Sequence, residues 1–237
     1  MTTQDLHAPE PFRPLAFRGT PSDADGELDR LTVPYTGQPR MRLTVTSGMA
    51  DARIRVDSEA TDLLAIDSGD GIAPRVRVSG SELRVSWPFT FESWLRGLVG
   101  ESRDIEILLH PAVEWTLQIR GGLSRFEADL TRGKLEHLEI SGGVSDALID
   151  LPAATAVVPI RITGGSSNLA LRRPAGSEVA LAVRGGISAL VLDDQEFGSI
   201  GGEARLASGS AVGDAPRYAV EISGGASALE IVPRAAL

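Results

Sequence analysis

The chain has 237 residues, of which 42% are hydrophobic and 23% are charged, and its net charge is −9 at pH 7. This composition is typical of a soluble globular protein with one sizeable core, and the negative charge argues against nucleic acid as a partner. The 26 glycines favour a fold with many turns, and a sequence without cysteine excludes disulfides and thiolate metal sites.

Residues 1–30 are predicted to be a flexible tail. They contain four prolines and the polar run "SDADGELD", which cannot bury enough apolar surface to become ordered. The first residues lack a basic start followed by an apolar stretch, and no later segment approaches 18 apolar residues in a row. We therefore expect a cytoplasmic protein with one domain over residues 31–237.

Short strands are predicted from about residue 40 onward. Aliphatic side chains occupy every second position in "ADARIRV" at 50–56, "SELRVSW" at 81–87 and "RDIEILL" at 103–109. Such alternation indicates strands that bury one face.

The segment 87–102, "WPFTFESWLRGLVGES", interrupts this alternation. Its large side chains follow a helical spacing and Thr90 suits an N-cap, so we expect a short amphipathic helix. The helix either covers an open flank of the domain or binds a protein partner, and a membrane is the weaker alternative because lysine and arginine are not enriched. The candidate partner surface consists of Phe89, Phe91, Trp94, Leu95 and Leu98.

A hexapeptide with two glycines and a serine recurs through the second half of the chain. "IRGGLS" at 119–124 is followed by "ISGGVS", "ITGGSS" and "VRGGIS" at intervals of 21 or 22 residues, and by "ISGGAS" after a gap of 39. The repeated residues are Gly121, Gly122 and Ser124; Gly142, Gly143 and Ser145; Gly164, Gly165 and Ser167; Gly185, Gly186 and Ser188; and Gly224, Gly225 and Ser227. This short period predicts a solenoid.

Aliphatic residues flank each hexapeptide in a constant register. They lie two and four positions after the serine, and five and seven positions before it. We expect these positions to face inward, the glycine pair to form the bend, and the serine hydroxyls to face inward as well. A coil of about 21 residues suits a three-sided parallel β-helix in which each coil stacks on the preceding one.

The last coil is predicted to form an end of the rod. Only "VPRAAL" follows Ile231, so Pro233 and Arg234 either blunt the final edge or leave it open for end-to-end assembly into filaments.

The glycine-serine coils between 119 and 232 resemble the bacterial putative-adhesin family of right-handed β-solenoid repeats. More distantly, a tailed β-helix is similar to the bactofilins, which polymerise in the cytoplasm. The first resemblance implies the hand of the winding and an exported protein. The predicted fold is therefore all-β, a single right-handed parallel β-helix with coils of about 21 residues and a short helical insert.

An outward acidic column is the strongest candidate for a ligand site. It holds Asp129, Asp150 and Asp193, interrupted by Arg172, with Asp194 beside the last carboxylate. Such carboxylates bind calcium in β-helix enzymes that cleave acidic sugars, and the alternative is a solvated face that keeps the rod soluble. His7, His110 and His137 are scattered, and no G-x-S-x-G motif occurs.

We therefore predict a non-enzymatic scaffold or interaction module without a cofactor, which binds a protein partner or assembles with itself. One alternative is a β-helix that binds or cleaves carbohydrate through the acidic column. Another alternative is an adhesin-like surface module.

Overall fold

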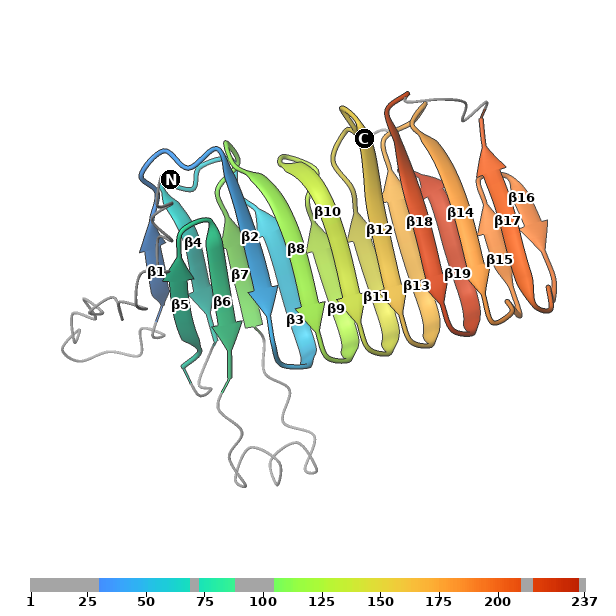
Figure 1. Ribbon diagram of the computed structural model, residues 1–237, viewed down its shortest axis with the longest axis horizontal. Coiled ribbons are helices and arrows are strands. Elements are labelled where there is room, and N and C mark those ends of the chain that lie inside the picture. Colours follow the sequence, from blue (N-terminus) through green and yellow to red (C-terminus); the bar gives the residue numbers. More distant parts are fainter. Residues whose placement is uncertain (1–29, 69–72, 88–104, 210–214, 235–237) are drawn as a thin grey trace, which may run out of the picture.

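The computed structural model describes residues 30–68, 73–87, 105–209 and 215–234, and its regular elements are all β-strands (Figure 1). Sheet A contains, in spatial order, β1 (Leu31–Pro34), β4 (Asp62–Asp67), β7 (Ile105–Leu109), β3 (Met49–Val56), β9 (Leu123–Asp129), β11 (Val144–Asp150), β13 (Ser166–Arg173), β19 (Ala226–Pro233), β15 (Leu190–Leu192) and β16 (Gln195–Phe197). Sheet B contains β17 (Glu203–Ser208), β14 (Glu178–Arg184), β18 (Arg217–Ser223), β12 (Val157–Thr163), β10 (Lys134–Ser141), β8 (Glu114–Arg120), β2 (Arg40–Val45), β6 (Glu82–Ser86) and β5 (Arg75–Ser79). The predicted all-β class is confirmed.

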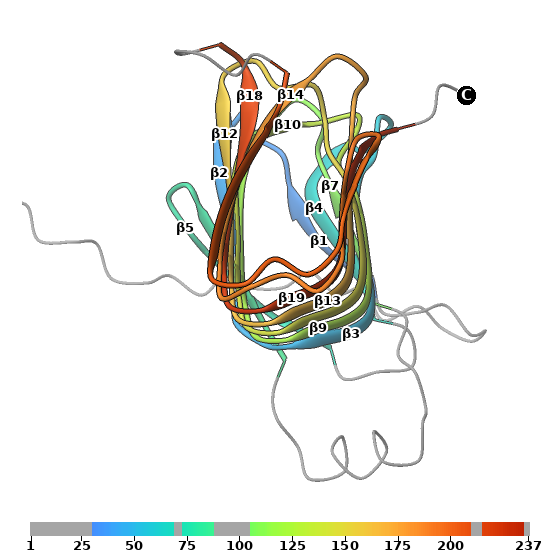
Figure 2. The same ribbon diagram turned by 90° about the vertical axis from the view of Figure 1, so that its right-hand side faces the viewer.

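Each glycine-serine repeat supplies one strand to each sheet, and the glycine pair lies at the turn between them. In the central coils, strands one repeat apart pair in parallel, so that Ile140 of β10 lies between Ile119 of β8 and Ile162 of β12. Viewed along the long axis, sheet B forms one wall, and the strands of sheet A run along the base and up the facing wall (Figure 2). Opposite this base, the return from sheet A to sheet B is a turn such as 130–133 and not a strand.

The inner faces of the two sheets enclose one apolar core. The aliphatic positions predicted on both sides of the hexapeptide are buried in all five repeats. Among the largest fully buried side chains are Trp115, Phe126 and Tyr218. The Trp115 indole donates a hydrogen bond to the carbonyl of His110 and the Tyr218 hydroxyl donates one to the carbonyl of Pro152, so both buried polar groups are satisfied.

The serine column faces outward, which corrects the predicted inward orientation. Around β11, Val144 is buried, Ser145 and Asp146 both face outward, and Ala147 is buried again. Asp146 has a left-handed backbone with φ of 51° and is skipped in the pairing of β11 with its neighbours. This left-handed residue recurs at the same place in the neighbouring strands and reverses the alternation, so the residue before each serine takes the inward place. The serines that this corrects are Ser124, Ser145, Ser167, Ser188 and Ser227.

The coils do not stack in sequence order at the two ends of the molecule, contrary to the prediction. β2 and β3 lie between the strand pairs β6–β7 and β8–β9. β18 and β19 lie between β12–β13 and β14–β15 (Figure 1). The second insertion explains the interval of 39 residues before the last hexapeptide. After β14 and β15 the chain first forms β16 and β17 at the ends of the two sheets, and then runs back to form β18 and β19 inside them.

Antiparallel strands close both ends of both sheets. β1 and β16 end sheet A, β5 and β17 end sheet B, and each pairs antiparallel with its inner neighbour. Ile231, predicted to lie in the terminal coil, instead lies inside sheet A between Leu171 and Leu192. The edge formed by the last coil is therefore not available for end-to-end assembly.

Two predicted features lie outside the described residues. The first is the predicted tail, of which the structure describes only Arg30. The second is the insert at 87–102, of which it describes only Trp87, so the whole candidate partner surface lies outside the described residues. Within the described ranges, no helix could span a lipid bilayer.

Candidate functional site

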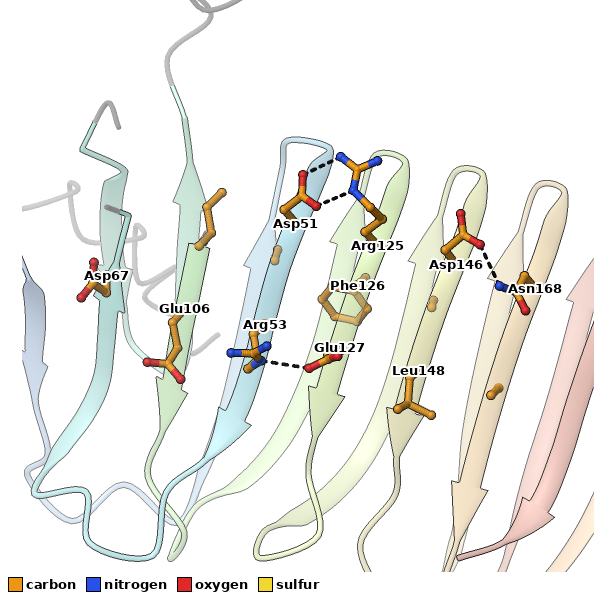
Figure 3. A pocket seen from close by; sticks show the side chains of 14 residues that line it. Asp51, Arg53, Asp67, Glu106, Arg125, Phe126, Glu127, Asp146, Leu148 and Asn168 are labelled. Carbon is orange, nitrogen blue, oxygen red and sulfur yellow. Dashed lines mark hydrogen bonds and ion pairs between the residues drawn. The ribbon is translucent and has the colours of Figure 1, made fainter. Parts of the chain in front are cut away.

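The outer face of sheet A is hollowed into a trough, which Figure 3 shows from close by. The residue after each serine position points outward because its backbone is left-handed, so one row of polar side chains crosses four neighbouring strands. A second row lies two residues further along the strands, and Leu148 and Ala170 form its apolar part. The polar lining consists of Asp51, Arg125, Asp146 and Asn168 in the first row, and of Arg53, Glu127, Glu106 and Asp67 beside it.

Hydrogen bonds in the trough run from strand to strand. Arg125 donates from Nε and Nη2 to both carboxylate oxygens of Asp51. Arg53 Nε donates to Glu127 Oε2 at 2.9 Å. Asn168 Nδ2 donates to Asp146 Oδ1 at 2.7 Å, as the dashed lines in Figure 3 show. The trough thus presents planar donors and acceptors held in fixed positions along the rod.

The arginines of the trough are paired with carboxylates on neighbouring strands. The hydrogen bond from Arg125 to Asp51, followed by the charge of that carboxylate, raises the pKa of Arg125, which stays protonated. Exposed ion pairs of this kind contribute little to folding stability. In the described part of the chain, no three His, Asp or Glu side chains lie close enough together to hold a metal ion. We interpret the trough as a surface that can exchange hydrogen bonds with a polar ligand.

The three carboxylates of the predicted acidic column each bind other side chains of the chain. Asp129 accepts hydrogen bonds from the backbone and hydroxyl of Thr131. Asp150, which is paired in register with Asp129, binds Arg172 through two hydrogen bonds. Asp193 lies beyond the inserted strand β19 and follows β15. The carboxylates therefore do not converge on one point.

The third carboxylate belongs to a buried polar cluster that was not predicted. Arg173 is only 3% exposed, and it occupies the inward position held by Leu130 and Leu151 in the preceding coils. Its guanidinium binds Asp193 and donates to Ser208 Oγ at 3.0 Å, and Ser208 donates to the same carboxylate. Asp193 thus neutralises a buried cation where sheet A meets β17.

The glycine-serine turns form a second depression along one edge of the molecule. Its lining alternates exposed second glycines such as Gly143 and Gly165 with outward serines such as Ser145 and Ser167. Residues 199–201, which connect β16 to β17, form one side of it. The serines line a surface that reaches solvent, yet they have no acid or base beside them in that lining.

Two of the histidines lie in the described residues, in different surroundings. His110 stacks on Tyr35 with ring centroids 3.8 Å apart, and burial lowers its pKa. His137 lies in β10 on the outer side of sheet B, where burial and then the charge of Arg161 lower its pKa. Neither histidine lines the trough or the depression along the turns.

The trough was not predicted from the sequence, because its polar residues were interpreted as the solvent-facing positions of ordinary alternating strands. The outward polar residue after each serine position is visible in the sequence, as are the polar residues two positions later. Which of them pair could not be predicted, because Asp51 and Arg125 are 74 residues apart and meet only through the insertion of β3 beside β9.

Comparison with known proteins supports the fold. A solved structure described as a putative cell adhesion protein from Clostridium sporogenes has a TM-score of 0.65 and 18% sequence identity. The similarity covers 88% of this chain and 99% of that one. No family model matches the chain, and no curated protein matches it. At this identity the likeness shows a shared fold.

Proposed function

We propose that the chain is a single right-handed β-solenoid and acts as a non-enzymatic, adhesin-like binding module. The observation that carries this proposal is that antiparallel strands, and not repeat coils, form both ends of both sheets, while the outer faces of the sheets stay open. The hand is the one expected for parallel crossover connections. A rod with closed ends and open faces is suited to binding along its sides.

The trough on sheet A is the proposed ligand site. Its donors and acceptors lie on neighbouring strands about 4.8 Å apart, which suits an extended ligand that crosses several strands. Side chains such as Glu127 and Asn168 can bind the hydroxyl groups of a neutral glycan, and Leu148 offers apolar contact beside them. The likeness in fold to a putative cell adhesion protein supports a binding role over a catalytic one.

A self-assembling scaffold is the second candidate, and the end strands argue against it. β1 ends at Pro34, β5 carries Arg75 and Arg77 outward, and β17 carries Glu203 and Arg205 outward. Proline and charged side chains on edge strands oppose pairing with another sheet. An adhesin-like role also implies export, and fractionation of cells expressing the chain would test whether the protein is exported.

The chain is expected to be monomeric. Light scattering of the full chain across concentration should give a constant mass near 25.0 kDa. Replacing the edge charges by Glu203→Val together with Arg205→Val should produce association that increases with concentration, because the edge then becomes apolar and adhesive. A wild-type chain that forms filaments would contradict the proposal and favour the scaffold.

Loss of trough side chains is expected to abolish ligand binding. The labelled full chain should bind neutral glycans on an array, and Glu127→Ala combined with Asn168→Ala should weaken that binding about tenfold or more, as expected when two directed hydrogen bonds are lost. The matched control is Gln118→Ala combined with Glu139→Ala, a bonded glutamine and glutamate on sheet B. Equal binding by both variants would place the ligand elsewhere, and no glycan binding by the wild type would exclude this ligand class.

A further inference from the structure

The outer face of sheet B carries a row of side chains without a carboxylate. The row crosses β5, β6, β2, β8, β10 and β12 at the positions nearest the glycine turns. The strand registers and their continuation by one residue place in this row Arg75, Ser86, Thr46, Arg120, Ser141 and Thr163. We call it the arginine-hydroxyl row. Ser223 of β18 extends it, again with a hydroxyl group.

Positive charge gathers at the β5 end of this row. Arg77 of β5 lies directly opposite Arg84 of β6, and Arg42 lies on the adjacent strand β2. Like charges placed opposite each other across strands are destabilising, and Glu82 forms an ion pair with only one of the three. This clustering occurs on a chain with a net charge of −9. The charge of Glu82 also acts on Arg42, so one carboxylate serves two of the three arginines, and Arg77 has no ion pair within the described residues, which points to an external anion.

The two arginines of the row differ from several other arginines of the molecule. Within the described residues, Arg75 and Arg120 are exposed and have no ion pair. By contrast, Arg53, Arg161 and Arg172 each lie within 4 Å of a carboxylate on a neighbouring strand. The guanidinium groups of the row are therefore free to bind an anion without first breaking an existing pair.

The geometry of the row selects a linear ligand. With strands about 4.8 Å apart, Arg75 and Arg120 are separated by about 14 Å and the row is about 24 Å long. Hydroxyl groups of serine and threonine fill the positions between and beyond the two arginines. We propose that the arginine-hydroxyl row binds an anionic polysaccharide, whose acidic groups contact the arginines and whose sugar hydroxyls contact the serines and threonines. This second site lies on the opposite sheet from the trough and is independent of it.

Other polyanions fit this face less well. The outward positions of β2, β5, β6 and β8 hold no aromatic side chain on which bases could stack, as single-stranded nucleic acid requires. The same positions hold no exposed apolar side chain that could enter the head-group region of a membrane.

The test uses the full chain with polygalacturonate and heparin as anionic probes, dextran as the neutral probe and oligo-dT as the nucleic-acid probe. Wild type should bind both anionic glycans, with affinity that falls as salt rises, whereas any binding of dextran should depend neither on salt nor on the arginines of the row. Arg75→Gln combined with Arg120→Gln should weaken binding at least tenfold and lower the salt slope by about 2, one for each lost contact. Thr163→Val, which removes a hydroxyl group and keeps the shape, should weaken binding several-fold.

The matched control is Arg132→Gln combined with Arg205→Gln, which makes the same change in net charge away from the row. The control should bind like wild type. Equal losses in both double variants would reduce the effect to overall charge and overturn the proposal. Tighter binding of oligo-dT than of either anionic glycan would overturn it too, as would a wild-type chain that binds neither. Trough variants should leave this binding unchanged, so failure here is distinct from failure of the proposed function.

Discussion

Gly142→Ala is expected to destabilise the fold by about 3 kcal/mol or more, whereas Gly143→Ala should cost about 1 kcal/mol or less. Gly142 has φ of +145°, and a Cβ added there would lie 2.6 Å from the carbonyl carbon of Gly121 in the neighbouring coil. The backbone of Gly142 and the backbone of Gly121 are closely stacked, so neither coil can move away without disturbing the hydrogen bonds between the neighbouring strands. At Gly143 the nearest atom would be 3.8 Å away, and the backbone there is not left-handed.

Urea unfolding of the two variants gives the measurement, because the pair differs only in which glycine of one turn gains a methyl group. The expected result is a large shift of the midpoint for the first variant and a small shift for the second. Similar midpoints would show that the turn relaxes, and that the close stacking of the glycine turns is not required for stability.

Asp193→Ala is expected to destabilise the fold by about 3 kcal/mol, as the loss of one partner of a buried ion pair does. The substitution leaves the guanidinium of Arg173 in the core with only Ser208 as a side-chain partner. Asp150→Ala is the control, since Arg172 is 38% exposed and water can solvate it once its carboxylate partner is removed. That control should cost about 1 kcal/mol or less.

A second substitution tests the cause of this loss. Arg173→Leu combined with Asp193→Ala removes both charges and restores the residue found at the aligned positions Leu130 and Leu151. Stability should return to within about 1 kcal/mol of wild type, because a well-packed apolar residue replaces an ion pair at little cost. If the double variant is as unstable as Asp193→Ala alone, the carboxylate acts through Ser208 and not through the buried charge.

The sequence predicted the core and the position of the bend but not the orientation of the serines. The aliphatic positions were predictable because a period of two and a constant repeat length define one inward face. A single left-handed residue such as Asp146 reverses that face, and aspartate is compatible with an extended backbone as well as with a left-handed one. The inward positions lie two and four residues after each serine, and strict alternation back from them placed the serine itself on the inward face.

The order of the coils could not be predicted from the repeat. Because every coil presents the same aliphatic columns, Ile162 can pair as well with Val183 of the next repeat as with Ile222, which it contacts in the structure. The trough and the arginine-hydroxyl row were missed for the same reason, since both are composed of side chains that meet only across strands. The buried arginine did leave a signal, as a charged residue at an aligned leucine position.

The insertion of β18 and β19 also constrains how the protein is made. A ribosome releases β14 and β15 before the strands that separate them from β12 and β13, so the rod cannot grow coil by coil during translation. Until residues 217–233 emerge, β12 and β14 can pair directly with each other, because their aliphatic positions match. Such pairing would leave no place for β18 between them. The native stack is completed only when residues 217–233 are available, and folding of the central coils is therefore linked to the synthesis of β18 and β19.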